Sequence, residues 1–353
     1  MNALIKIKKL LKTYRLDAYI IPKNDEFFSE YAFPNRLKTI SNFSGSAGFS
    51  IVTESKNFLF VDGRYLIQSK MESGKNFKIV EIPYSLPKNI LNNIKFKTIG
   101  YDPKLITSTI LDRYFGRKFQ LVPIKINLVD SIFLEKKNSN NLFFKVDDKI
   151  IGESVYSKIH RVVKVLKKYK SNSIFISAPE NVAWLLNIRG NDNPNSPIPN
   201  ARLIIDNKKK IFFFSDLNKA KQIRNKIKYN KIEFYSYENF YNVLSSLNSS
   251  RFTIDKLTCS IYYESLINSK FVINNFEDPI YNLKSIKSKI EIENTIKSHI
   301  YDGAALTKFL FWLKRNYKKK NISEISAQEK LLRFRKENKN FKSLSFPTIS
   351  SCG

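Results

Sequence analysis

One unit of secondary structure occurs twice in this sequence, and the repetition constrains the fold more than any other feature. The unit is a buried apolar strand, a short helix and a hairpin whose second strand ends in aspartate. In the first copy we expect the strand at residues 17–22, the helix from Asp25 and the hairpin strands at 49–53 and 58–62. The second copy follows the same order at residues 173–177, 179–186, 201–205 and 210–216. This order predicts two related α/β domains.

Changes in composition divide the chain into four segments. The run 135–141 is polar and charged, which is typical of the approach to a linker. From residue 287 onward, apolar residues recur at helical spacing, and a further helix is expected from about Ser323, with residues 326–329 as its capping box. We therefore predict a first α/β domain, a linker, a second α/β domain and the start of an incomplete third domain, with boundaries 1–135, 136–150, 151–285 and 286–353.

The net charge of +30 allows a different interpretation, a basic nucleic-acid-binding protein. Only 13 of the 61 basic residues are arginine, however, and the basic side chains are scattered through every segment. Lys, Asn, Ile, Phe and Tyr are abundant together, which is typical of codon bias in an AT-rich genome. No RNA-binding aromatic motif, Cys/His finger or basic heptad array occurs. We therefore expect no specific nucleic-acid partner.

The sequence shows no membrane or secretory signature. Lysines interrupt the apolar positions of the first helix, unlike the apolar core of a signal peptide. No later apolar stretch is long enough to span a bilayer. The two cysteines, Cys259 and Cys352, are far apart and form no metal or redox spacing, which suits a reducing cytosol. We expect a cytoplasmic protein without a membrane partner.

Most standard catalytic motifs are absent from the sequence. It contains no phosphate-binding loop, no G-x-G-x-x-G and no H-E-x-x-H. With only His160 and His299, a His-rich metal cluster is excluded. The stretch 44–48 lacks the G-x-S-x-G spacing of a nucleophile elbow and favours a tight turn in which glycine permits a close backbone approach. The residues by themselves predict no complete active site.

Three polar positions are candidates for function, and each also has a purely structural interpretation. Arg64 follows a strand end, where its guanidinium could hold a carboxylate or a peptide carbonyl, although chemistry alone favours a surface ion pair. Loop 187–197 is expected to be a structured turn in which Arg189 pairs with Asp192. His299 lies next to the apolar helical positions, where a lone histidine is more often a packing residue.

Together these motifs resemble the aminopeptidase P family, the three-domain branch of the pita-bread metallopeptidases. The matching blocks occur in the family's order along the whole chain, with Val61 in place of the family's Thr and Phe133 in place of its Trp. The blocks lie at residues 18–22, 29–31, 36, 43–48, 60–65, 127–132, 184–190, 192, 197, 299, 302–306, 311–313 and 345–350.

The resemblance implies both a fold and an activity. The fold is two creatinase-N-terminal-like α/β domains, each a mixed sheet flanked by helices, followed by the first helices of a pita-bread catalytic domain. The activity is that of an Xaa-Pro aminopeptidase, a hydrolase that uses two divalent metal ions, usually manganese. Its substrates are peptides with proline in second position. Arg64 maps onto the family arginine that contacts the substrate, and a homodimer is expected.

In the family, the metal ligands and the proton-handling histidines would follow Gly353. The resemblance therefore implies no catalytic residue and no metal ligand in this chain, no bound metal, and no hydrolysis by the chain alone. The alternative is a non-catalytic creatinase-N-type binding or oligomerisation module, but such a module would leave the apolar helices after residue 287 uncovered. Creatinase or prolidase itself is disfavoured because those relatives lack the second α/β domain indicated by residues 184–192.

Overall fold

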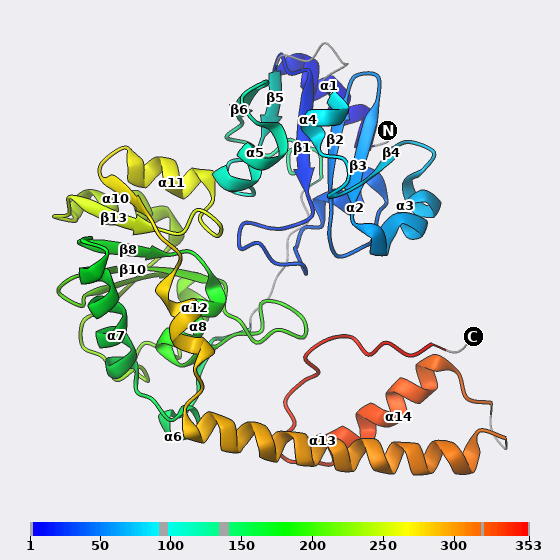
Figure 1. Cartoon of the computed structure of the whole chain (residues 1–353), viewed down its shortest axis with the longest axis vertical. Helices are drawn as coiled ribbons and strands as arrows, with labels where there is room; N and C mark the ends of the chain where they lie inside the picture. Colours follow the sequence, from blue (N-terminus) through cyan, green and yellow to red (C-terminus); the bar gives the residue numbers. More distant parts are fainter. Residues whose placement is uncertain (1–2, 92–97, 134–140, 319–320, 352–353) are drawn as a thin grey trace.

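The computed structural model describes residues 3–91, 98–133, 141–318 and 321–351. Figure 1 shows three parts arranged around an open space. We call them domain 1 (residues 3–133), domain 2 (residues 141–286) and the terminal segment (residues 287–351).

Domain 1 contains a six-stranded mixed sheet with helices on both faces. Its strands are β1 (Ala18–Pro22), β2 (Phe49–Thr53), β3 (Asn57–Val61), β4 (Lys78–Glu81), β5 (Thr98–Tyr101) and β6 (Gln120–Pro123). Its helices are α1 (Ala3–Thr13), α2 (Arg36–Ser41), η1 (Gly63–Tyr65), α3 (Leu66–Ser73), α4 (Pro87–Ile90) and α5 (Ser108–Phe115). The strand order is β4-β3-β2-β1-β5-β6. Strands β1, β2 and β3 are buried along their whole length because an apolar cluster covers each face.

Domain 2 repeats this architecture. Its sheet strands are β8 (Ser173–Ile176), β10 (Ala201–Asp206), β11 (Ile211–Ser215), β12 (Ile232–Tyr235), β13 (Arg251–Ile254) and β14 (Val272–Asn275). Its helices are α6 (Asp148–Ile151), α7 (Val155–Lys168), α8 (Pro179–Leu186), α9 (Leu217–Ala220), η3 (Tyr237–Asn239), α10 (Phe240–Ser246), α11 (Ile261–Asn268) and α12 (Pro279–Ser285). A small sheet joins β7 (Phe144–Lys145) to β9 (Ile188–Arg189). The large sheet has the order β12-β11-β10-β8-β13-β14, which matches domain 1 strand for strand.

The predicted fold class of two related α/β domains is thus confirmed, but one predicted helix is wrong. Asp25 does not begin a helix, because its carboxylate accepts hydrogen bonds from the amides of Phe27 (2.9 Å) and Ser29 (3.1 Å) and closes a turn. The helix after β1 begins at Arg36, where the side chain of Asn35 caps it.

The terminal segment is a pair of helices, α13 (Lys289–Asn316) and α14 (Glu324–Lys336), that pack against each other. A capping box begins each helix, and in α14 it joins Ser323 to Ser326. The predicted box at 326–329 is therefore placed one turn too late. Large apolar side chains are exposed along this segment, among them Ile292, Ile296, Ile300, Leu306, Leu310 and Phe311.

Some sequence-based expectations concern residues outside those described. Residues 136–140 of the predicted linker and Cys352 belong to this group, whereas Cys259 is buried in domain 2. Within the described ranges, no helix combines the length and apolarity that a membrane crossing requires.

Candidate functional site

Arg64 lies where β3 ends and the chain turns into α3. Asp62 fixes this turn, because its Oδ1 accepts a hydrogen bond from the Arg64 amide at 3.0 Å. The same carboxylate binds the guanidinium twice, with Nε at 2.9 Å and Nη2 at 2.8 Å. The Arg64 side chain is 69% exposed, and its Nη1 has no hydrogen-bond partner among the described residues. The arginine is therefore held in one orientation and keeps an open donor.

The Tyr65 ring packs against the guanidinium of Arg64, and neighbouring side chains hold this ring in place. The central carbon of the guanidinium lies 5.1 Å from the ring centre of Tyr65. The Tyr65 hydroxyl is hydrogen-bonded to Ser46 at 2.7 Å, and the ring packs edge-on against Phe43. At Gly48, which has a φ of +142°, an added Cβ would lie 2.7 Å from a backbone carbonyl oxygen. The close backbone approach predicted for the stretch 44–48 is therefore present.

The charges at this position are stable around neutral pH. Hydrogen bonding to Arg64 lowers the pKa of Asp62, and the same bond raises the pKa of Arg64 further above its ordinary value. The Glu30 carboxylate makes a smaller contribution to the raised pKa of Arg64. Both groups therefore keep their charge throughout the neutral range.

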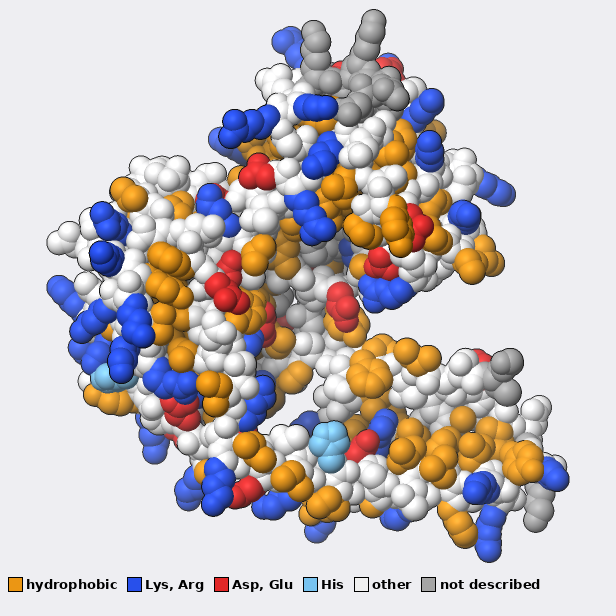
Figure 2. All heavy atoms as spheres, viewed as in Figure 1, with side chains coloured by type: hydrophobic (Ala, Val, Ile, Leu, Met, Phe, Trp, Pro, Cys, Tyr) orange, Lys and Arg blue, Asp and Glu red, His pale blue; other side chains and the backbone are white. Residues whose placement is uncertain are grey.

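The turn that carries Arg64 leads directly into α3, which can be located in the figures. In Figure 1, α3 lies on the side of domain 1 that faces α13 and α14. Figure 2 shows the space between these parts as an open notch. Contacts to Arg64 within the described chain come from domain 1, so the structure does not bring the other candidate residues to it.

The second candidate region forms its own closed cluster. Asp192 pairs with Lys219 and accepts a hydrogen bond from the Asn200 amide at 2.7 Å. Arg189 instead donates to two backbone carbonyls, one in α8 and one in β9. The predicted pairing of Arg189 with Asp192 is therefore wrong.

The two histidines lie apart from each other and from Arg64. His299 is exposed on α13, so the expectation that it packs in a core is wrong. His160 contacts the Tyr156 carbonyl (3.0 Å) and the ammonium of Lys209. Among the described residues, no group of three or more His, Cys, Asp or Glu side chains could hold a metal ion.

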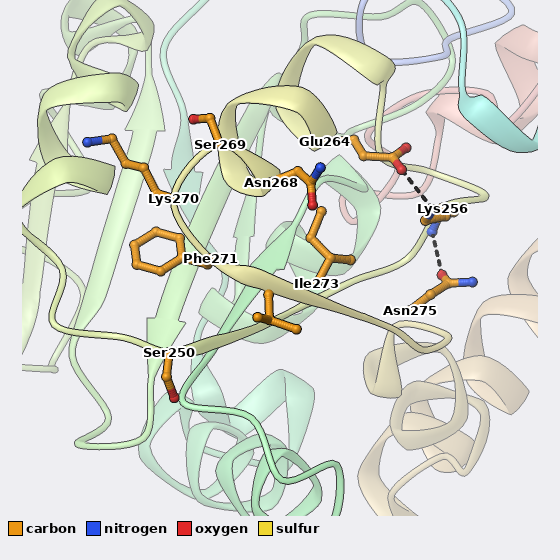
Figure 3. Close-up of a pocket in the computed structure, with 10 residues that line it drawn as sticks. Ser250, Lys256, Glu264, Asn268, Ser269, Lys270, Phe271, Ile273 and Asn275 are labelled. Atoms are coloured by element: carbon orange, nitrogen blue, oxygen red, sulfur yellow. Dashed lines mark hydrogen bonds and ion pairs between the residues drawn. The ribbon is translucent and has the colours of Figure 1, made fainter.

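Among the described residues, two of the hollows lie away from Arg64, which lines neither of them. One, of about 1270 Å³, lies between the small sheet and the terminal segment and is lined by Arg189, Tyr301 and Phe341, among others. The other, of about 700 Å³, lies between α11 and the edge strand β14. Figure 3 shows Lys256 in this second hollow, where it forms an ion pair of 2.8 Å with Glu264.

Comparison with known proteins defines the class of this fold. Residues 4–130 match a family model described as the Creatinase/Prolidase N-terminal domain, and residues 135–291 match a second model of the same description. The two matches contain the two α/β sheets described above. The chain therefore contains two creatinase/prolidase N-terminal domains.

Within this class, the chain is similar to the Xaa-Pro aminopeptidases P, as the sequence motifs predicted. The probable Xaa-Pro aminopeptidase P of Laccaria bicolor is 32% identical over 373 residues, which cover 99% of this chain and 57% of the relative. The probable enzyme of Coprinopsis cinerea is 29% identical over 382 residues, covering 99% and 61%. The crystal structure of X-prolyl aminopeptidase from Caenorhabditis elegans matches with a TM-score of 0.89 and 26% identity, over 99% of this chain and 62% of that one. The chain thus spans 57% to 62% of the length of these relatives.

The C. elegans protein is described as a cytosolic enzyme with a di-nuclear active site. Two metal ions of that kind need a cluster of carboxylate and imidazole ligands. The described residues of this chain do not provide such a cluster, so they do not fit a di-nuclear centre.

Proposed function

We propose that this chain is the N-terminal, substrate-facing part of an Xaa-Pro aminopeptidase, and that Arg64 contacts the peptide. The observation that supports this is an exposed guanidinium that is held on a rigid turn and keeps one donor open. Asp62 prevents the side chain from swinging freely, so little rotamer entropy is lost when a ligand binds. Arg64 is therefore suited to orient a substrate.

The chemistry of the proposed substrate matches a donor-only group. The nitrogen of an Xaa-Pro bond carries no hydrogen, so this unit offers only acceptors to a hydrogen-bonding partner. A guanidinium has donors and no acceptor, and it binds carbonyl and carboxylate oxygens well. We propose that Nη1 of Arg64 donates to an oxygen of the bound peptide.

The remaining parts of the proposal follow from the resemblance. We propose that hydrolysis uses two divalent metal ions, with manganese as the native metal, and that it requires more than residues 1–353; the partial coverage of the relatives supports this. We propose a cytoplasmic homodimer, and the C. elegans neighbour described as cytosolic supports the location. We propose no specific nucleic-acid partner, since the visible face in Figure 2 carries its Lys and Arg side chains on all three parts.

Binding of a fluorescent Ala-Pro-Ala peptide to the 353-residue chain tests the role of Arg64. We expect Arg64→Gln to weaken the affinity by about tenfold, because one charge-assisted hydrogen bond is lost. Arg117→Gln is the matched control, since Arg117 is exposed in domain 1 outside the contacts described for Arg64. Equal affinities for Arg64→Gln and the parent chain would refute the proposed contact.

A hydrolysis assay of the same chain with manganese and an Xaa-Pro peptide tests the proposal that residues 1–353 are not sufficient for hydrolysis. We expect no release of the N-terminal residue. Release at a rate proportional to protein concentration would show that residues 1–353 are sufficient for activity.

A further inference from the structure

Arg202 is the largest fully buried side chain among the described residues. It projects from β10 of domain 2 and is 1% exposed. A buried guanidinium is unfavourable unless hydrogen bonds and counter-charges compensate for the lost water. Its environment therefore has to supply several specific partners.

These partners come from both domains. Nη2 of Arg202 donates to the backbone carbonyl of Glu26 in domain 1, and the Glu26 carboxylate lies 3.8 Å from the same nitrogen. Nη1 donates to the hydroxyl of Tyr263 in domain 2 at 3.2 Å. The guanidinium carbon lies 4.0 Å from the ring centre of Phe27 (domain 1), 4.6 Å from Tyr263 and 6.0 Å from Tyr237 (domain 2). We call these residues the Arg202 cage.

The domain 1 half of the cage belongs to a loop that is itself fixed. Asp25 is buried and holds the amides of Phe27 and Ser29. Lys23 donates to the carbonyl of Glu30 at 2.9 Å, at the far end of the same loop. The Glu30 carboxylate is also the smallest of the causes that raise the pKa of Arg64. The domain 1 side of the cage is thus held in place by hydrogen bonds within its own loop.

A second set of contacts between the domains lies beside the cage, on the turn of α11 that also carries Tyr263, and is formed by topologically equivalent segments. The loop after β5 meets the loop after β13, where Thr107 and Ser260 form an isolated antiparallel bridge. The Ile261 amide donates to the carbonyl of Ile106 at 3.0 Å, and Ser108 donates to Glu264 at 2.7 Å. A single contact of this kind would allow two domains to rotate about it, which is the usual expectation for moderate interdomain interfaces. The Arg202 cage gives this interface a second fixed point, because it also holds the loop after β1 of domain 1.

We propose that Arg202 is a positioning residue that locks the angle between domain 1 and domain 2, and thereby fixes where Arg64 stands relative to domain 2. The evidence for the lock is the geometry of the Arg202 cage within this chain. Its consequence for Arg64 rests on the proposed function. The pairing is asymmetric: domain 2 supplies the cation, and domain 1 supplies a carbonyl, a carboxylate and a ring.

The distance between the domains measures the lock directly. Spin labels at Met71→Cys on α3 and Lys164→Cys on α7 report it, because both positions are exposed and lie in different domains. The background carries Cys352→Ser, and the buried Cys259 stays in place. We expect a single narrow distance distribution for the parent chain. We expect Arg202→Met to broaden the distribution about twofold, because the second fixed point is lost.

Further variants separate a lock from a general folding defect. Phe27→Ala removes the ring from the domain 1 side and should broaden the distribution in the same way. Arg202→Lys should restore part of the narrow distribution, because the charge over the rings remains but one ammonium cannot reproduce the planar fork. Arg251→Met is the matched control, since Arg251 is exposed on β13 of the same sheet. Each variant is compared by circular dichroism to verify that both domains stay folded.

The spin-label distance distribution tests the lock without any bound peptide. A narrow, unchanged distribution in folded Arg202→Met or in folded Phe27→Ala would overturn the lock. If the distribution broadens while Arg64→Gln leaves peptide affinity unchanged, the lock stands and the proposed function of Arg64 fails. If both proposals hold, Arg202→Met should also weaken binding of the Ala-Pro-Ala peptide, with Arg202→Lys in between.

Discussion

The two α/β domains share one topology but differ in what they present at the end of their second hairpin strand. In each domain an aspartate caps the turn after that strand, Asp62 in domain 1 and Asp216 in domain 2. The turn of domain 2 is closed, because Lys219 pairs with Asp192, which is 4% exposed. The turn of domain 1 is open, with Arg64 in solvent. A duplicated scaffold thus keeps an accessible cation in one copy and an internal ion pair in the other.

A second difference lies at the start of the helix that follows the first strand of each sheet. In domain 1, Arg36 at the start of α2 binds both oxygens of Asp130 at 2.7 Å. At the equivalent point of α8 in domain 2, Asn181 donates to the buried carboxyl of Asp278 at 2.7 Å. At the start of this helix, domain 1 therefore has an ion pair between Arg36 and Asp130, whereas domain 2 has a hydrogen bond from the neutral amide of Asn181 to Asp278.

The largest predicted effect tests this second difference through pH. Burial raises the pKa of Asp278 to about 7, so the folded protein holds this proton more tightly than the unfolded chain does. The contribution of Asp278 to the free energy of unfolding is fully present below about pH 4, and about 4 kcal/mol is lost as the pH rises to about 7. In Asp278→Asn this dependence should disappear, which urea unfolding at pH 4.5 and 7.5 would measure.

Other titrating groups do not obscure this comparison. Asp25 and Asp102 also have pKa values raised by burial, but both residues are present in the parent chain and in Asp278→Asn. Their contributions therefore cancel when the unfolding free energies of the two proteins are subtracted. Asp255 and Lys284, which act on the charge of Asp278, likewise remain. A difference in unfolding free energy that is the same at both pH values would contradict the prediction.

The next effect tests the turn that supports Arg64. Gly48 precedes β2 with a φ of +142°, whereas Asn200 occupies the corresponding place before β10. Gly48→Ala should lower the free energy of unfolding by about 3 kcal/mol, because the side chain meets both an unfavourable φ and a backbone oxygen at 2.7 Å. Gly116→Ala is the control, since that glycine has a positive φ but no atom near its Cβ, and we expect about 1 kcal/mol. Equal losses would show that the close approach at Gly48 is not important.

The duplication was predictable from sequence because it depends on short apolar runs that local pattern reveals. Apart from one serine each, strands β2 and β11 consist of β-branched and aromatic residues, and turn residues bound them. The helix predicted from Asp25 was wrong because a carboxylate can close a turn as well as cap a helix, and only the neighbouring amides decide between the two. Periodicity similarly suggested packing for His299, which tertiary structure left exposed.

The contacts between domains could not be predicted in this way. A single arginine inside the apolar run 201–205 was a usable signal, since a charge in a buried strand requires partners. Its partner Glu26, however, lies 176 positions earlier in the sequence, and no local pattern encodes that separation. Arg64 was located from sequence as a residue at a strand end, whereas its exposure and its open donor depend on the tertiary structure.

A smaller effect is expected at the closed turn of domain 2. Lys219→Gln removes the cation from a carboxylate whose side chain is 1% exposed, and we expect a loss of about 2 kcal/mol in the free energy of unfolding. The exposed pair of Lys308 with Glu337 supplies the control Lys308→Gln, for which a loss below about 0.5 kcal/mol is expected. Urea unfolding at neutral pH measures both. A similar loss in the two variants would mean that Asp192 does not depend on Lys219.

The smallest effect on stability is expected at the open turn of domain 1. Arg64→Gln leaves Asp62 exposed enough to be hydrated and still able to cap the turn through the backbone amide, so the unfolding midpoint should not change measurably. Lys219, which follows its capping aspartate by three residues where Arg64 follows by two, should therefore affect stability more strongly than Arg64 does. If Arg64→Gln destabilised the chain as much as Lys219→Gln, Arg64 would be a structural ion pair like its counterpart, and the distinction between an open and a closed copy would fail. An unchanged midpoint together with weaker peptide binding would instead mean that this arginine serves a ligand and not the fold.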